Sequence, residues 1–217
     1  IVLSALLFVL GQPNVLFEDG QPFFALIALA PSFYVIGRSS VRSSFFFGFL
    51  FGLLSYAGMC FWLSHYTRGL FPVVLASYSL LYAAAFGGMK LLSRCYPAFA
   101  FPVMALAFCA FEYLKTLGPL GFSYGVIGYS QWTCRPLLLT ASVGGVWIPS
   151  FLCVFFSALC AEVLSLYPTG LARRTFVFFS VLCSCGVFFF LLGLQLSLRG
   201  AECRDVTVDR KSTRLNS

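Results

Sequence analysis

Residues 43–64 read SSFFFGFLFGLLSYAGMCFWLS, a run of 22 residues without a charge. Ten of these residues are phenylalanine or leucine. Near the centre of a membrane helix each of them favours insertion by roughly 0.3 to 0.6 kcal/mol, which amounts to about 3 to 6 kcal/mol for the run. Because lipid offers the backbone no hydrogen-bond partners, an isolated segment that crosses a bilayer must be helical. The run therefore predicts a transmembrane helix.

Five more uncharged runs suit a single crossing of a bilayer, which needs about 20 apolar residues. They cover residues 20–37, 69–89, 95–111, 136–161 and 175–198. The chain also begins in an apolar stretch, at Ile1 rather than at a methionine, and we interpret residues 1–10 as part of a clipped first helix. Together the runs predict an all-α membrane protein with about seven transmembrane helices, in a polytopic domain at residues 1–198.

The composition of the whole chain agrees with this class. Of the 217 residues 60% are hydrophobic and only 10% are charged, whereas soluble chains carry about 25% charged residues. A net charge of +7 could indicate nucleic-acid binding, but the basic residues stand singly or in pairs between apolar runs and form no basic stripe. They are typical of residues that anchor helix ends to anionic headgroups, so we exclude a nucleic-acid partner.

The basic residues also predict the orientation of the chain, because cytoplasmic loops are enriched in lysine and arginine. With the N-terminus in the cytoplasm, the inner loops hold six basic residues and the outer loops hold three. The inner ones are Arg38, Arg42, Lys90, Arg94, Arg173 and Arg174, and the outer ones are Arg68, Lys115 and Arg135. We therefore expect a multi-pass protein with a cytoplasmic N-terminus and a C-terminal end on the opposite side of the membrane.

Residues 199–217 are polar and charged, unlike the rest of the chain. Within 199–209, Val206 and Val208 alternate with polar residues, as in a first strand, and we expect a truncated soluble domain to start here. The last stretch, RKSTRLNS at 210–217, fits neither a membrane nor a protein core, and we interpret it as a non-native tail. The chain is thus expected to be a fragment.

The nine cysteines predict no metal site. Most of them lie inside apolar runs, and one pair, Cys183 and Cys185, has a CxC spacing with no histidine nearby. We interpret the cysteines as small buried hydrophobic residues and expect neither a metal nor a cofactor.

Two pairs of glycines with the spacing GxxxG predict close packing between helix backbones. They are Gly48 with Gly52, and Gly121 with Gly125.

One stretch does not suit a straight membrane helix: EYLKTLGPLGFSYGVIGYSQ, residues 112–131. The chain is uncharged for 19 residues from Thr116 to Cys134, which is long enough for an eighth span. However, four glycines, a proline and several polar side chains disfavour a continuous helix, and an eighth span would reverse the charge asymmetry of the later loops. We therefore expect a broken or re-entrant segment near 117–131 that lines a cavity at the outer face.

Glu112 stands at the outer end of the run 95–111 and allows two interpretations. A carboxylate deep in a bilayer costs about 2.5 to 3.5 kcal/mol on insertion scales. Near the interface the cost is smaller, so Glu112 is either an interfacial residue paired with Lys115, three positions on, or a cavity-facing polar anchor for substrate or a neighbouring loop.

Aromatic side chains gather near the same end of the predicted bundle. Trp62, Tyr66 and Trp132 are typical of an aromatic belt at the membrane interface, and His65, the single histidine, also suits an interfacial position. The alternative is that such residues line a groove through which a lipid enters. The candidates for a substrate groove are Trp62, His65, Glu112, Tyr124, Tyr129, Ser130 and Gln131.

The order of several motifs resembles a known family. Glu112 and Tyr113 form an acid-aromatic pair that ends one span; a glycine- and aromatic-rich segment with Gly121 and Phe122 follows and closes in GYSQ at 128–131. A span that contains Gly144 to Val146 comes next. From about Leu3 to Leu198 the series resembles the N-terminal membrane half of bacterial apolipoprotein N-acyltransferases.

The resemblance implies an enzyme of the bacterial inner membrane with a nitrilase-like domain that faces the periplasm. Such an enzyme moves an acyl chain from a phospholipid to a cysteine thiol, and then to the α-amino group of a diacylglyceryl-cysteine at a lipoprotein N-terminus. The expected partners are therefore a phospholipid acyl donor, a diacylglyceryl lipoprotein acceptor and membrane lipids. The catalytic Glu, Lys and Cys of the family belong to the soluble domain, so no residue of this chain is assigned a catalytic role, and the fragment alone is expected to be inactive.

Two other functions stay open from the residues alone. A small transporter or channel subunit would also contain broken helices, but transporters usually carry paired broken segments and intramembrane charges. This sequence offers one such segment, and its acids lie at span ends. A membrane scaffold subunit without chemistry of its own is the other alternative.

Overall fold

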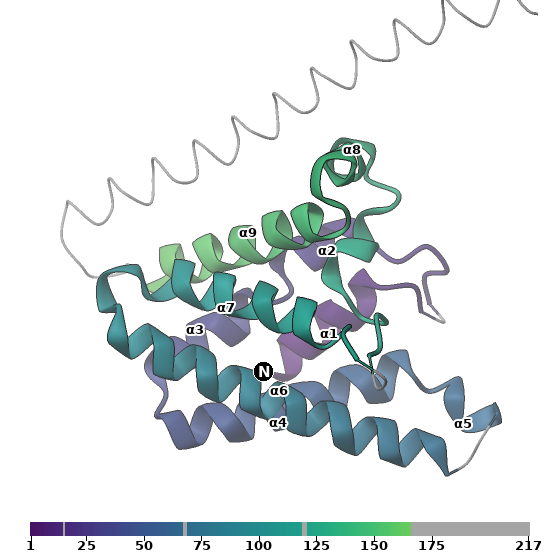
Figure 1. Cartoon of the computed structure of the whole chain (residues 1–217), viewed down its shortest axis with the longest axis horizontal. Helices are drawn as coiled ribbons and strands as arrows, with labels where there is room; N and C mark the ends of the chain where they lie inside the picture. The colour runs from purple at the N-terminus through teal and green to yellow at the C-terminus, as the bar shows by residue number, and fades with distance from the viewer. Residues whose placement is uncertain (15, 67–68, 119–120, 166–217) are drawn as a thin grey trace, which may run out of the picture.

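The computed structural model describes residues 1–14, 16–66, 69–118 and 121–165, without the side chain of Tyr66. The predicted span 175–198, the expected start of a soluble domain at 199–209 and the tail at 210–217 lie outside these residues. The described part forms helices and no strand (Figure 1). The helices are α1 Val2–Gly11, α2 Pro22–Ile27, α3 Ala30–Arg38, α4 Val41–Met59, α5 Leu63–Tyr66, α6 Leu70–Cys95, η1 Pro97–Phe99, α7 Ala100–Leu114, η2 Ile127–Gln131, α8 Arg135–Gly144 and α9 Trp147–Ser165.

Four long helices lie side by side in the order α4, α6, α7 and α9 (Figure 1). The antiparallel pair α4 and α6 lies at the bottom of the view, and the shorter helices α1, α2 and α3 pack against α4 and α9. Four stretches are long and apolar enough to cross a membrane: Val41–Met59, Leu70–Cys95, Pro97–Leu114 and Trp147–Ser165. The prediction of an all-α membrane protein is thus confirmed, and in the described part four helices have the length of a span.

The run 43–64 forms most of α4, which begins where a serine caps it. The Ser40 hydroxyl accepts a hydrogen bond from the Ser43 backbone N–H at 3.1 Å, which satisfies one of the free donors at the helix start. Gly48 and Gly52 let α4 approach α6 closely: a Cβ on Gly48 would collide with the Tyr82 carbonyl oxygen, and one on Gly52 would lie 2.8 Å from the Ser79 Cα. The close packing predicted from this pair is confirmed.

The second glycine pair does not join two helices. Gly125 has a φ of +75°, in the left-handed region that favours glycine, and it lies in an irregular stretch between α7 and η2. The prediction of helix packing at Gly121 and Gly125 is therefore wrong: the second glycine serves a turn.

Two predicted spans are each broken into two helices. The run 136–161 forms α8 and α9, because Gly145 has a φ of +65° that ends α8 and turns the chain. With ten residues α8 is only about 15 Å long, too short to cross a bilayer. The run 20–37 forms α2 and α3, with Pro31 in the first turn of the second helix, where a missing N–H costs nothing.

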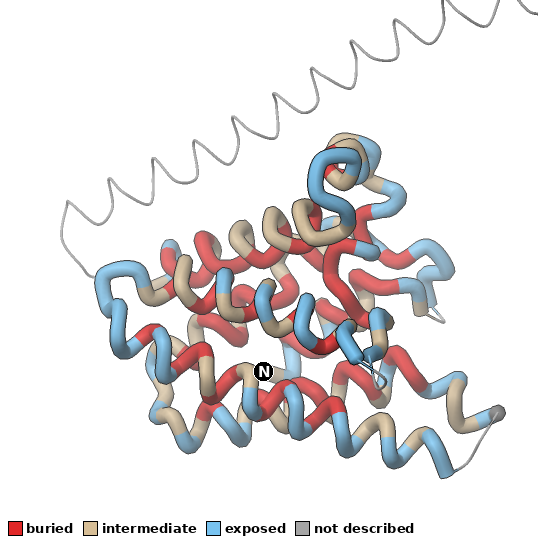
Figure 2. Tube along the Cα trace, viewed as in Figure 1, coloured by how far each residue is buried: buried red, intermediate tan, exposed pale blue. Residues whose placement is uncertain are grey.

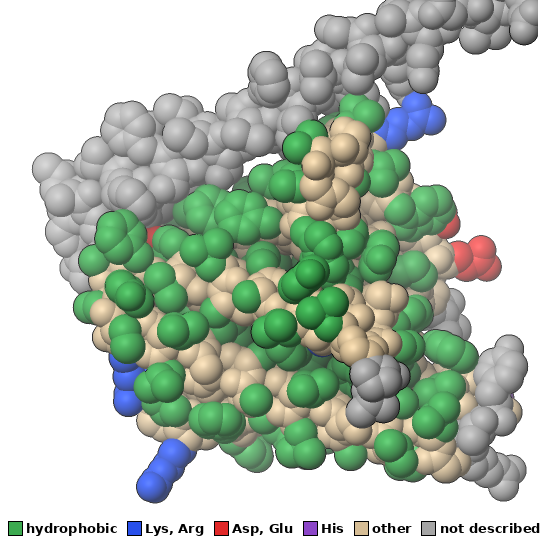
Figure 3. Space-filling model, in the orientation of Figure 1, with side chains coloured by type: hydrophobic (Ala, Val, Ile, Leu, Met, Phe, Trp, Pro, Cys, Tyr) green, Lys and Arg blue, Asp and Glu red, His purple; other side chains and the backbone are tan. Residues whose placement is uncertain are grey.

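The core is built from aromatic side chains that point inward from different helices. The Phe51 ring of α4 lies 5.4 Å from the ring of Phe8, 5.3 Å from that of Tyr82 and 5.2 Å from that of Phe86. Figure 2 shows the buried residues along the inward sides of the helices, and Figure 3 shows hydrophobic side chains spread over the visible face, with the charged side chains at its edges. A largely apolar outer surface is what lipid requires of a spanning bundle.

Candidate functional site

The chain between α7 and α8 runs through the bundle without forming an α-helix. In its described part, residues 115–118 and 121–134, the only helical element is the short 3₁₀ helix η2. Val126 and Ile127 are completely buried, and η2 packs against α1, α2 and α9. The prediction of a broken segment near 117–131 is thus confirmed, and this stretch is called the irregular segment below.

Two oppositely charged side chains from the end of α7 hold the irregular segment. The Lys115 Nζ donates a hydrogen bond to the Gly125 carbonyl at 3.0 Å and another to the Tyr82 hydroxyl at 3.3 Å. The Glu112 Oε1 accepts a hydrogen bond from the Ile127 N–H at 2.8 Å. Because Tyr82 lies at the middle of the 26-residue α6, the lysine reaches far into the bundle.

Neutral side chains bind the carbonyl groups on either side of Gly125. The Tyr56 hydroxyl of α4 donates to the Tyr124 carbonyl at 3.2 Å. The Gln12 Nε2, just after α1, donates to the Val126 carbonyl at 3.2 Å. The irregular segment is therefore attached to elements that lie far from it in the sequence.

The last attachment comes from α9. The Gly128 N–H donates to the Ser150 Oγ at 2.9 Å, and Ser150 itself is buried. Inside η2 the Ser130 hydroxyl donates to the Ile127 carbonyl at 2.6 Å. The Gln131 Nε2 donates to the Pro22 carbonyl at 3.1 Å, at the start of α2.

These contacts have one physical cause. In a bilayer, irregular backbone is tolerated only where protein or a water-filled cavity satisfies its polar groups. Here five side chains supply donors or acceptors to the backbone of five consecutive residues, 124–128. They come from the ends of α1 and α7, from α4 and from α9. The polar residues of this chain therefore hold a stretch of backbone inside the bundle.

Of the two interpretations of Glu112, the structure favours the polar anchor for a neighbouring loop. Glu112 is 0% exposed and binds the irregular segment at Ile127, while Lys115 binds the same segment at Gly125. The second oxygen of Glu112, Oε2, is buried and makes no hydrogen bond to the described residues. Burial lowers the pKa of Lys115 to about 8, although the Glu112 charge acts in the opposite direction.

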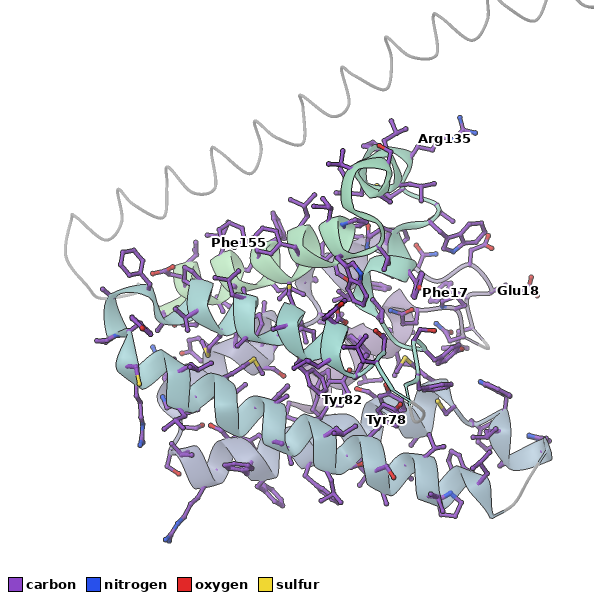
Figure 4. All side chains as sticks on the ribbon, viewed as in Figure 1. Phe17, Glu18, Tyr78, Tyr82, Arg135 and Phe155 are labelled. Atoms are coloured by element: carbon purple, nitrogen blue, oxygen red, sulfur yellow. The ribbon has the colours of Figure 1, made fainter. Side chains whose placement is uncertain are left out.

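Aromatic rings surround the outer part of the irregular segment. The Tyr56 and Tyr78 rings stack at 4.5 Å, the Phe122 ring lies 5.6 Å from Tyr78, and the Trp62 ring lies 6.3 Å from Tyr124. Figure 4 labels Tyr78 and Tyr82 on α6, below the irregular segment. Trp62 is 44% exposed, so this aromatic cluster extends from the core to the surface.

The predicted groove residues fall into two groups. Buried members bind backbone: Glu112, Ser130 and Gln131. Members with accessible side chains are Trp62, His65, Tyr124 and Tyr129.

Within these groups, only some side chains come together. The Trp62 ring meets that of Tyr124, and the Gln131 Nε2 lies 2.8 Å from the Ser130 Oγ. His65 lies on α5 and packs against the ring of Phe61 at 5.4 Å.

Several residues of the site were missed by sequence reasoning. The sequence predicts Lys115 as a loop charge or a partner of Glu112 and does not single out Gln12, Tyr56 or Ser150. A polar side chain inside an apolar run was the available signal, because such a group needs a partner once it is in the membrane.

The described residues hold no group of three or more His, Cys, Asp or Glu side chains that could bind a metal ion. Their six cysteines are all free. Burial raises the pKa of Cys60, at the end of α4, to about 11, so this cysteine stays a thiol at neutral pH.

Comparison with known proteins identifies relatives of this chain. The model of the apolipoprotein N-acyltransferase N-terminal domain matches residues 4–159. The chain is 42% identical over 163 residues to apolipoprotein N-acyltransferase 1 of Treponema denticola, which covers 75% of this chain and 30% of the relative. It is 38% identical over 153 residues to apolipoprotein N-acyltransferase 1 of Treponema pallidum, covering 70% and 28%. It is 31% identical over 192 residues to apolipoprotein N-acyltransferase of Geobacter metallireducens, covering 80% and 34%.

The matched part of the chain thus spans 28–34% of the length of these relatives. No solved structure matches the chain. The irregular segment and all of its supporting side chains fall inside the matched range. The chain belongs to the apolipoprotein N-acyltransferase family, through that family's N-terminal domain.

Proposed function

We propose that this chain is the membrane part of a phospholipid:apolipoprotein N-acyltransferase of the bacterial inner membrane. The observation that carries the proposal is the match of residues 4–159 to the N-terminal domain of that family. The bundle supports it, because an enzyme with two lipid-linked substrates needs a membrane-embedded part that can receive them. The match also favours this function over a transporter subunit or a scaffold.

The chemistry would proceed in two steps outside the described residues. A cysteine thiolate attacks the ester carbonyl of a phospholipid and releases a lysophospholipid, which leaves a thioester. The α-amino group of a diacylglyceryl-cysteine then attacks the thioester, forms the amide and regenerates the thiol. The buried Cys60, with its pKa raised to about 11, is a poor nucleophile for this purpose.

The accessible aromatic residues are the groups that we assign to substrate contact. Trp62, Tyr124 and Tyr129 combine an apolar ring with a polar atom, which suits the level of lipid headgroups and glycerol esters. We add His65, whose exposed side chain lies three residues after Trp62, on α5. Glu112, Ser130 and Gln131 act indirectly, because they hold the irregular segment on which Tyr124 and Tyr129 stand.

The orientation follows from the charges of the loops. We propose a cytoplasmic N-terminus, an irregular segment that opens to the periplasmic face, and a C-terminal end on the periplasmic side. In this arrangement residues 199–209 begin a soluble catalytic domain, and residues 210–217 are not part of the native protein.

The test is to recover the reading frame beyond residue 209 and to express the protein in bacteria whose own N-acyltransferase can be depleted. The expected result is growth, together with lipoproteins whose N-terminal peptides gain the mass of a third acyl chain. The chain 1–217 is the control and should give neither. If the complete protein leaves lipoproteins diacylated, the proposed function is wrong.

A further inference from the structure

The two buried charges at the end of α7 lie on opposite sides of one residue of the irregular segment. The peptide group before Val126 gives its carbonyl, at Gly125, to the Lys115 ammonium. The peptide group after Val126 gives its N–H, at Ile127, to the Glu112 carboxylate. Each peptide dipole is therefore oriented by the charge it faces, and Val126 itself is completely buried.

We propose that Glu112 and Lys115 act as one electrically neutral unit that positions the irregular segment for substrate binding. The proposal rests on the function proposed above and adds a role for two residues that touch no substrate. It makes them positioning residues, since they act through the backbone of residues 125–127.

The electrostatic reason for treating the two residues as a unit is burial. Glu112 is 0% exposed and Lys115 is 6% exposed. Removing one partner of a buried pair leaves an uncompensated charge and is strongly destabilising, whereas removing both avoids that penalty. The remaining contacts to residues 124–128, from Tyr56, Gln12 and Ser150, come from neutral groups and cannot replace either charge.

The functional consequence follows from where the segment's aromatic residues stand. Tyr124 lies two residues before Val126 and Tyr129 lies three after it, and both have accessible side chains. The Tyr124 ring also meets Trp62 of the outer surface at 6.3 Å. A shift at Val126 would therefore separate the groups that we assign to lipid contact, without touching the residues that carry out the chemistry.

The experiment is a double-mutant cycle in the complete enzyme. Glu112→Gln keeps an acceptor for the Ile127 N–H but removes the negative charge, and Lys115→Met removes the positive charge at similar length. We expect each single variant to raise KM for the phospholipid donor about tenfold or more, and the double variant to be about tenfold better than the product of the two single effects. The kcat at saturating phospholipid should change little, because the chemistry lies elsewhere.

Ser150→Ala provides a matched control. It removes a neutral hydrogen bond to the same segment, at Gly128, and its coupling with Lys115→Met should be clearly smaller than the coupling between Glu112→Gln and Lys115→Met. Coupling of the same size in both cycles would overturn the proposal, since it would indicate general loosening of the segment. The proposal would also be overturned if the effect of the double variant on KM equalled the product of the two single effects, or if the variants lowered kcat and left KM unchanged.

A second measurement covers variants that fail to fold. We then expect the double variant to accumulate in the membrane at a higher level than either single variant, and an equal or lower level would contradict the proposal. This outcome is independent of activity, so it also separates the two proposals. If the unaltered enzyme does not N-acylate lipoproteins, the proposed function is wrong. The membrane levels of the variants test only the proposal that Glu112 and Lys115 act as a unit.

Discussion

Lys115 occupies a position from which a lysine usually extends into water or toward headgroups. Its side chain turns inward because the Gly125 carbonyl would otherwise lack a donor at a depth where water is excluded. Sequence reasoning could single out Glu112, since an acid at the end of an apolar run is unusual. It could not find the direction of Lys115, because a helix end permits both directions and the choice depends on a segment folded beneath it.

At the scale of the residue, Tyr56→Phe should destabilise the bundle by about 1 kcal/mol, because the partly buried Tyr124 carbonyl loses its donor. The free energy of unfolding, measured by titration of the detergent-solubilised chain with SDS, checks this. Tyr96→Phe is the control: Tyr96 is 59% exposed, and this substitution should change the free energy of unfolding by no more than about 0.5 kcal/mol. Equal effects of the two changes would contradict the assigned hydrogen bond.

At the scale of the element, sequence reasoning succeeded where a span is a single continuous helix. The runs 43–64, 69–89 and 95–111 correspond to α4, α6 and α7, with ends that differ by several residues. The prediction of one span at 136–161 failed, because hydropathy does not reveal a turn inside an apolar run. Gly145 takes a φ of +65° there, and a glycine in an apolar run carries no signal that separates such a turn from helix packing.

The packing of α4 on α6 leads to a second prediction. Gly48→Ala should lower the unfolding free energy by about 1–3 kcal/mol, because the new Cβ would collide with the backbone of α6 at Tyr82 and Ala83. Gly88→Ala on α6 is a matched control, since a Cβ there meets nothing within 4 Å. It should be neutral or slightly stabilising, because alanine favours helix over glycine. SDS titration again gives the measurement, and a harmless Gly48→Ala would contradict the close approach.

At the scale of the whole molecule, all three tryptophans lie around one end of the bundle. Trp62 and Trp132 are 44% and 49% exposed, and the Trp132 Nε1 donates to the Asp19 carbonyl at 3.0 Å. Trp147, at the start of α9, packs against the ring of Tyr113 at 5.2 Å. This grouping matches an interfacial belt, which sequence reasoning proposed from Trp62 and Trp132 because indole rings favour the headgroup level.

The grouping predicts a depth for these rings. In lipid bilayers, tryptophan fluorescence of the chain should be quenched more strongly by a nitroxide near the headgroup than by one near the end of the acyl chain. Variants that keep one tryptophan and replace the other two with phenylalanine assign the signal to each position. Stronger quenching from the bilayer centre at Trp62 or Trp132 would place this end of the bundle inside the hydrocarbon and contradict the arrangement.

The attachments of the irregular segment also have a consequence in time. Gln12 and Ser150, which bind Val126 and Gly128, are made near the beginning and near the end of the described chain. Until the ribosome has synthesised Ser150, at the start of α9, the Gly128 N–H lacks its hydrogen-bond partner. The backbone that follows α7 is therefore not fully hydrogen-bonded at that stage. The attachment at Gly128 can form only after the first turn of α9 has been made, so within the described residues the contacts of this segment are completed late.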